Sequence, residues 1–353
     1  MEKYTIINFA GRENEDPGLT EFYKNEDNRC YGREPVIAKM ANGTLVCILL
    51  SGGLTEPHNQ NVVLYKKSYD DGVTWTPAEV LFSHSHRGLW GTEIFMELDR
   101  PMMVISMYDG SCPFKLLQTF ISWSDDNGET WSKPTMADPA MCTTSIRRGI
   151  RLSNGDILFP LYYTMAHDCL DWDPTQANKP GFWDGTHHEC AVAVSADNGK
   201  NYTRYGRMEL PSHQLWENNC VEVSPGHIKM YMRADSPQTG FLALSESFDY
   251  GRTWSKPVLT DIPNPGTKVT AFMVGEKTCI ISNFDSESRI HLELRISGDG
   301  GETFDKIIPI EDGEAIYQYP HVIIDENEKK LYIAYENARL HILKKYTFDE
   351  IGL

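Results

Sequence analysis

The sequence predicts an all-β protein that folds as a six-bladed β-propeller and takes in residues 1–353 as one domain. Two turn-and-strand repeats alternate along the chain, one in five copies and the other in six. No long window shows the 3.6-residue apolar period of a helix, so helix should be scarce. All-β units that recur at intervals of about 50–70 residues suit propeller blades, each of which is a small antiparallel sheet.

The first repeat is an eight-residue pattern, Ser-x-Asp-x-Gly-x-Thr-aromatic. Asp hydrogen-bonds the nearby backbone and Gly accepts positive φ, so the pattern favours a tight turn. The Thr and the aromatic residue then begin a strand. We therefore interpret each copy as a hairpin turn and not as a calcium loop, because the ligand spacing of an EF-hand is absent. The five copies are Ser68–Trp75, Ser124–Trp131, Ser195–Tyr202, Ser247–Trp254 and Ser297–Phe304.

The second repeat is a turn followed by an apolar strand. Five of its six copies precede a copy of the first repeat, and the last does not. We expect the last blade to close the ring by pairing its C-terminal strand, His341–Tyr346, with the N-terminal segment. The six copies are Asn42–Ile48, Asp99–Ile105, Asn154–Pro160, Pro225–Tyr231, Gly275–Ile281 and Glu328–Ala334.

Charge limits the partners that the chain can bind. The 33 Lys and Arg residues against 50 Asp and Glu residues give a formal net charge of −17. A field of that sign repels phosphate backbones, so nucleic acid is not an expected partner. An anionic substrate would need a local cluster of arginines to overcome the global charge.

The remaining composition indicates neither a membrane partner nor a cofactor. No stretch approaches the about 18 consecutive apolar residues of a membrane span. The segment Met1–Asn8 lacks a long apolar core and a small-residue cleavage site, so a cytoplasmic location is expected. The eight cysteines form no CxxC pair, which argues against a zinc site and favours reduced thiols.

A polar segment, Met165–Glu189, separates the second and third copies of the first repeat. Its acids and histidines are Asp168, Asp171, Asp173, Asp184, His187, His188 and Glu189. A metal site there is conceivable, but no ligand pair has a diagnostic spacing, so we favour a solvated loop. The aromatic residues Trp172, Phe182 and Trp183 of the same segment could stack on a sugar ring.

From about Arg33 to Tyr346 the chain resembles the sialidase (neuraminidase) superfamily, in its bacterial branch with Asp-box repeats. Tyr31–Ile37 is similar to the family's Arg-Ile-Pro motif and supplies Arg33, with Glu34 in place of Ile. The family's Glu followed by a strand that ends in Arg matches Glu217 and Arg233. These motifs imply a carbohydrate site on a propeller.

Two further family positions have counterparts near the C-terminal end. Arg289 stands just before the fifth Asp-box, where the family has its third arginine. The segment Tyr317–His321 resembles the strand that begins with the family's nucleophilic tyrosine. Tyr317 is the preferred nucleophile, and Tyr319 is the second choice and otherwise part of the substrate site.

The resemblance implies a coherent chemistry. Sialic acid carries a carboxylate on its anomeric carbon, and the guanidinium groups of Arg33, Arg233 and Arg289 would bind it by charge-assisted hydrogen bonds. The substrate's own anion would repel a carboxylate nucleophile. A neutral Tyr317, deprotonated by Glu217, avoids that repulsion.

One departure concerns the general acid. The family places an Asp on a loop after the first inner strand, and the matching stretch here, Ser51–Gln60, contains none. Glu56 is the nearest acid, and we predict it as the proton donor. His58 is the alternative donor and a substrate-binding candidate, and Asp109 is a further possibility. The arginine that often precedes the family's Asp is also missing.

The function expected from these residues is a retaining exo-glycosidase acting on terminal sialic or related nonulosonic acids, an acidic sugar or glycan. Two alternatives remain open. A polysaccharide lyase on uronic acids also neutralises a carboxylate with Arg and uses Tyr or His for proton transfer. A non-catalytic sugar-binding propeller would use the same arginines without turnover.

Overall fold

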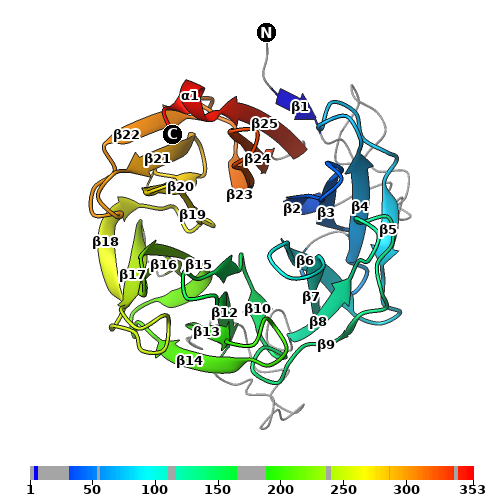
Figure 1. Ribbon diagram of the computed structural model, residues 1–353, viewed down its shortest axis with the longest axis horizontal. Helices are drawn as coiled ribbons and strands as arrows, with labels where there is room; N and C mark the ends of the chain where they lie inside the picture. The colour runs from blue at the N-terminus through cyan, green and yellow to red at the C-terminus, as the bar shows by residue number, and fades with distance from the viewer. Residues whose placement is uncertain are drawn as a thin grey trace. The chain divides into compact units, whose positions relative to one another are not determined.

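The computed structural model describes residues 4–6, 32–53, 56–109, 117–164, 188–235, 240–285, 287–337 and 341–353. Over these ranges the chain is almost entirely strand, arranged in six antiparallel sheets. Figure 1 labels these strands along the chain, which divides into two compact units. The first unit holds the described residues up to Met136 and from Tyr319 to Gly352, and the second those from Ala137 to Gln318.

The first unit contains three sheets. Two are built from consecutive strands, in the orders β2-β3-β4-β5 and β6-β7-β8-β9, and the third has the order β1-β25-β24-β23. The first two residues of β23, Tyr317 and Gln318, belong to the second unit. The strands are β1 (Tyr4–Ile6), β2 (Gly32–Lys39), β3 (Leu45–Ser51), β4 (Val62–Ser68), β5 (Glu79–Phe82), β6 (Gly88–Phe95), β7 (Met102–Tyr108), β8 (Gln118–Trp123), β9 (Thr135–Met136), β23 (Tyr317–Asp325), β24 (Lys330–Asn337) and β25 (His341–Thr347).

The second unit contains the other three sheets. Their orders are β10-β12-β13-β14, with β11 also paired to β12, then β15-β16-β17-β18 and β19-β20-β21-β22. The strands are β10 (Ser145–Ile146), β11 (Ile150–Arg151), β12 (Ile157–Thr164), β13 (His188–Ser195), β14 (Thr203–Met208), β15 (Gln214–Ser224), β16 (His227–Asp235), β17 (Phe241–Ser247), β18 (Val258–Pro263), β19 (Thr270–Val274), β20 (Lys277–Asn283), β21 (Leu292–Ser297) and β22 (Lys306–Pro309).

Both sequence repeats occupy the same places in every sheet that contains them. The Ser-x-Asp boxes join the third strand to the fourth, as between β4 and β5. In the first box Asp70 accepts hydrogen bonds from the backbone N–H and the hydroxyl of Thr74, at 2.8 and 2.6 Å, and Ser68 Oγ accepts one from Gly72 N at 2.8 Å. The interpretation of the boxes as turns, and the count of six units, agree with this arrangement.

The predicted pairing of the C-terminal strand with the N-terminal segment is confirmed. Strand β1 pairs antiparallel with β25, with Tyr4 opposite Lys344 and Ile6 opposite Ile342. The helix α1 (Phe348–Ile351) follows β25 and is the only helix in the described ranges. No helix of the described residues has the length and apolar character needed to cross a membrane.

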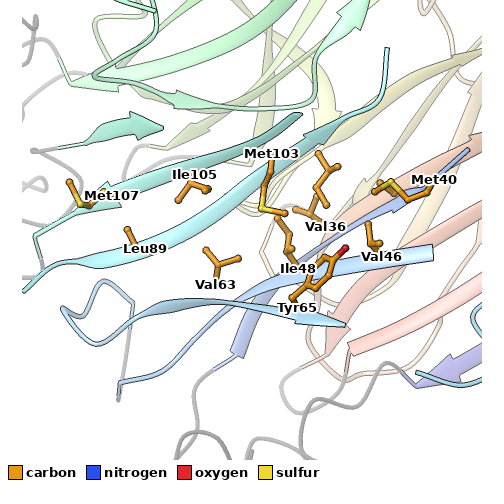
Figure 2. Close-up of a cluster of buried hydrophobic side chains, with 12 residues drawn as sticks. Val36, Met40, Val46, Ile48, Val63, Tyr65, Leu89, Met103, Ile105 and Met107 are labelled. Carbon is orange, nitrogen blue, oxygen red and sulfur yellow. The ribbon is translucent and has the colours of Figure 1, made fainter. Parts of the chain in front are cut away.

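The core of the first unit lies between its successive sheets. A cluster of buried side chains joins β2–β4 to β6 and β7, and Figure 2 shows Ile48 of β3 beside Met103 of β7. The two sheets approach closely because Gly91 has no side chain. A Cβ at Gly91 would lie 2.5 Å from Ile48 Cδ1. This tight packing fixes the strands whose ends bear the polar site residues.

The cysteines depart from expectation at one position. Cys47, Cys190, Cys220 and Cys279 are free and buried, and burial raises the pKa of the Cys279 thiol to about 12. Cys142 is disulfide-bonded, so the expectation of reduced thiols is wrong there. The spacing of cysteines along the chain could not show this, since a disulfide depends on the distance between Cα atoms in space.

Candidate active site

Arg33 is the centre of a charged cluster in the first unit. It is the second residue of strand β2 and stands immediately before a β-bulge, and its Nε lies 2.9 Å from Glu336 Oε1. Its Nη1 lies 3.7 Å from Glu56 Oε2, and its guanidinium carbon is 4.6 Å from the centroid of the Tyr319 ring. The fold therefore brings together three residues that were predicted separately from the sequence as site residues, namely Arg33, Glu56 and Tyr319.

Glu336 is a member of this cluster that the sequence did not reveal. It belongs to β24, and its side chain is only 3% exposed. Its second oxygen accepts a 2.6 Å hydrogen bond from the backbone N–H of Glu34, a residue held at φ +52° by the bulge. Glu34 in turn accepts a 3.2 Å hydrogen bond from Trp90 Nε1. Glu336 thus fixes both the guanidinium of Arg33 and the backbone beside it.

The loop that carries Glu56 is tied down by Asn61. The side chain of Asn61 accepts a hydrogen bond from His58 N at 2.7 Å and another from the Tyr108 hydroxyl, and it donates to Gly52 O. Both ends of the loop are therefore fixed to a buried amide. The Glu56 side chain is only 10% exposed, so it does not simply face solvent.

The alternative proton donors take part in local structure. His58 Nδ1 accepts a 3.1 Å hydrogen bond from Gln60 N, which closes a turn. Asp109 accepts a 3.5 Å hydrogen bond from Asn59 Nδ2. Glu56, the preferred donor, is the residue of this loop that forms the ion pair with Arg33 described above.

Glu217 is the centre of the charged cluster in the second unit. It lies in β15 at a register irregularity between Trp216 and Asn219, with φ at +42°. Its Oε2 lies 3.1 Å from Arg233 Nη1 on β16, and its Oε1 lies 3.3 Å from Nη2 of Arg147. The pairing with Arg233 joins two predicted residues, whereas Arg147 was not singled out.

The charges around Glu217 favour its ionised form. Burial acts to raise the pKa of Glu217, but the guanidinium groups of Arg233, Arg147 and Arg289 outweigh it and hold that pKa below its usual value. Arg233 is also bound by Asp235, at 3.0 Å to Nε and 2.6 Å to Nη2. Glu222, the other glutamate of the same strand, accepts from Ser153 and caps a turn.

Arg289 and Tyr317 are neighbours through the backbone. The Tyr317 N–H donates to Arg289 O at 2.8 Å, and the Tyr317 carbonyl accepts from Asn283 Nδ2 at 2.9 Å. The guanidinium of Arg289 donates to Gly266 O at 2.7 Å and to the side chain of Gln318. These bonds place the third arginine beside the first residue of β23.

The side chain of Tyr317 lies over a nearby loop. A Cβ built on Gly313 would be 2.8 Å from the Tyr317 hydroxyl. Burial, and then the charges of Glu311 and Asp312, raise the pKa of Tyr317. A phenol in this environment keeps its proton at rest, so nucleophilic attack by it would require a base.

The polar segment considered as a metal site falls mostly outside the described residues, since residues 165–187 are not among them. Of its candidates, His188 stacks on Trp216 at 4.0 Å between ring centroids. Glu189 is buried and binds Arg207 Nε at 2.9 Å and the Tyr163 hydroxyl at 3.1 Å. Within the described ranges no three His, Cys, Asp or Glu residues are grouped so as to hold a metal ion.

Comparison with known proteins shows the fold and the family of the chain. The Hadza microbial sialidase Hz136 superposes with a TM-score of 0.71 at 17% identity, over 92% of this chain and 69% of that one. This likeness shows the fold, the six-bladed β-propeller seen in sialidases, as the repeats predicted. A family model described as a BNR repeat-like domain matches residues 102–342, and the chain belongs to that family.

Two sialidases are similar to the chain in sequence. The sialidase of Paraclostridium sordellii is 24% identical over 271 residues, which are 68% of this chain and 62% of the relative. The sialidase of Bacteroides fragilis (strain YCH46) is 26% identical over 206 residues, 53% of this chain and 33% of the relative. The chain thus spans less than two thirds of the length of either relative.

Proposed function

We propose that this protein is a retaining glycoside hydrolase of the exo-α-sialidase type, which releases terminal sialic or related nonulosonic acids. The observation that best supports the proposal is the environment of Glu217, a buried carboxylate kept ionised by surrounding guanidinium groups. An ionised, fixed carboxylate beside arginines suits a general base in a site for an anionic sugar. The two sialidase relatives support the same class.

In this proposal Arg33, Arg233 and Arg289 bind the substrate's carboxylate. Each guanidinium is held by neighbouring groups, Arg33 by Glu336, Arg233 by Asp235, and Arg289 by Gly266 O. Such anchoring reduces the entropy lost when the arginine binds an anion. The planar guanidinium also matches the two oxygens of a carboxylate.

The proposed reaction has two displacements. The Tyr317 oxygen attacks the anomeric carbon while Glu217 accepts the phenolic proton, and the bond to the leaving oxygen breaks as Glu56 protonates that oxygen. Water then attacks the anomeric carbon and gives a proton to the Glu56 carboxylate, and the bond to Tyr317 breaks as Glu217 returns the proton. Two inversions give net retention. Tyr319 is the alternative nucleophile.

Glu56 is proposed as the acid in place of the family's Asp. Its contact with Arg33 suggests how it could serve. A substrate carboxylate that binds the Arg33 guanidinium would compete with Glu56, and release Glu56 to hold a proton for the leaving oxygen. His58 and then Asp109 are the alternatives.

The test is a product screen by mass spectrometry on a panel of sialosides and uronides. Release of a free nonulosonic acid, first formed as the same anomer as in the substrate, is the expected result. A product with a new ultraviolet-absorbing double bond would instead indicate a lyase. Binding of a sialoside without turnover at any pH from 4 to 8 would indicate a sugar-binding propeller. Either of these two results would overturn the proposal.

A further inference from the structure

The carboxylate of Glu217 is bound from two sides by two different arginines. Arg233 contacts Oε2, and Arg147 contacts Oε1. The two arginines differ in exposure, since the side chain of Arg147 is 1% exposed and that of Arg233 is 14% exposed. Arg147 is thus out of reach of solvent, and a substrate would meet Arg233 first.

Arg147 is held rigidly by the neighbouring strand β12. Its backbone N–H donates to Pro160 O at 3.0 Å. Its Nη2 donates to the Tyr162 hydroxyl at 3.1 Å, and its guanidinium carbon lies 5.3 Å from the centroid of the Tyr162 ring. A buried guanidinium needs a nearby negative charge, and Glu217 provides one.

Arg233 has a second acidic partner. Asp235 forms two hydrogen bonds to its Nε and Nη2, so the charge of Arg233 remains compensated if Glu217 moves away. Only Nη1 of Arg233 contacts Glu217. The Arg147–Glu217 contact and the Arg233–Asp235 contact are therefore two ion pairs, and the single 3.1 Å hydrogen bond from Arg233 Nη1 to Glu217 Oε2 joins them.

We propose that Arg147 is a positioning residue for the base Glu217, an inference that rests on the function proposed above. Arg147 keeps hold of Oε1 while the substrate's carboxylate takes the Nη1 of Arg233. Oε2 is then released and is able to accept the proton of the tyrosine. Substrate binding and the availability of the base are coupled in this way, for sugars that carry an anomeric carboxylate.

The groups that bear on the ionisation of Glu217 come from several elements. The charges that act on it directly are those of Arg233, Arg147 and Arg289. Tyr162 on β12 binds Arg147, Asp235 on β16 binds Arg233, and His188 on β13 stacks on Trp216, the residue before Glu217. Arg147 is the one among them that contacts Oε1 and is itself fully buried. Its removal should therefore make Glu217 harder to ionise.

The first test is the pH dependence of kcat/KM for a sialoside in Arg147→Met and Arg147→Lys. Loss of the charge should move the acid limb of the Met variant upward by about one pH unit, hence about tenfold lower activity on that limb. The Lys variant, which keeps a charge, should move less. An unmoved limb in Arg147→Met would reduce Arg147 to a structural residue and overturn the proposal.

Arg204→Met is the matched control for this measurement. Arg204 belongs to the same sheet and its guanidinium carbon lies 5.0 Å from the ring centroid of Tyr163, yet it binds Ala140 O. Its substitution should leave the acid limb in place. A shift of the limb in Arg204→Met equal to that in Arg147→Met would also contradict the proposal, because the shift would then be nonspecific.

A second readout requires no activity. The melting temperature of Arg147→Met should fall strongly in the wild-type background and much less in Glu217→Gln, since the neutral amide does not need the guanidinium. Equal losses in both backgrounds would show that the two side chains are not coupled, and would overturn the inference. If no sialoside is turned over, the proposed function fails and Arg147 has no base to position. The comparison of melting temperatures in the two backgrounds then reports only on the Arg147–Glu217 ion pair.

Discussion

Replacing Glu336 by Ala should destabilise the protein markedly. One oxygen of Glu336 binds Arg33 Nε at 2.9 Å and the other accepts from Glu34 N at 2.6 Å. An orphaned buried N–H costs about 1–3 kcal/mol. Breaking a fully buried ion pair costs about 3–5 kcal/mol, but Arg33 is 22% exposed, so we assign about 1–2 kcal/mol to the pair.

The sum is a loss of about 2–5 kcal/mol in the free energy of unfolding, measured by denaturant titration. Glu336→Gln is the matched control, because the amide oxygen can still accept from Glu34 N, and it should lose about 1–2 kcal/mol. A change below about 0.5 kcal/mol in Glu336→Ala would refute the reasoning.

Three further changes test the site and the fold. Arg289→Ala should remove about 2–5 kcal/mol of transition-state stabilisation, which lowers kcat/KM for a sialoside at least about 30-fold. Arg295→Ala is the control. It removes the ion-pair partner of Glu293 on strand β21, and kcat/KM should change little. An unchanged value in Arg289→Ala would contradict its role. Glu56→Gln should slow hydrolysis of natural glycosides by about 10²–10⁴-fold and that of an activated aryl glycoside far less; equal rates for mutant and wild type on a natural glycoside would eliminate it as the acid. Gly251→Ala should lose about 1–3 kcal/mol of stability by denaturant titration, because φ is +82° and the new Cβ would lie 2.6 Å from a leucine methyl. A Gly251→Ala variant as stable as the wild type would contradict this expectation, because the turn would then accommodate the new Cβ without strain.

The repeat architecture could be predicted from the sequence because its determinants are local. Each Ser-x-Asp box satisfies its turn within a few residues, as when Asp249 binds the backbone and hydroxyl of Thr253. The same signal therefore appears in every copy, whichever sheet contains it. Five boxes and six turn-strand units gave the correct number of sheets.

Parts of the site could not be predicted, because their partners are distant in sequence. Arg147 meets Glu217 across 70 residues, and Glu336 meets Glu34 across 302. Neither residue stands in a recurring pattern. Arg147 stands beside Arg148 without any spacing that points to a carboxylate. Such pairs depend on which strands the fold places side by side, and sequence periodicity does not report this.

The residues that were predicted share a different property. Arg33, Glu217, Arg233 and Arg289 were found by resemblance to motifs, and the structure gives each of them a definite set of polar partners. Their proposed roles in the reaction remain predictions. The same is true of the single domain over residues 1–353.

The central claim is a retaining reaction with a tyrosine nucleophile, and covalent trapping tests it most directly. The protein is incubated with 2,3-difluorosialic acid, digested and mapped by mass spectrometry. A fluorosialyl adduct on Tyr317, absent in Tyr317→Phe, is the result we predict. The ring of Tyr319 packs on Arg33, and the Tyr319→Phe variant should still form the adduct on Tyr317. An adduct on Tyr319, or turnover of the sugar with no adduct on any tyrosine, would contradict the account.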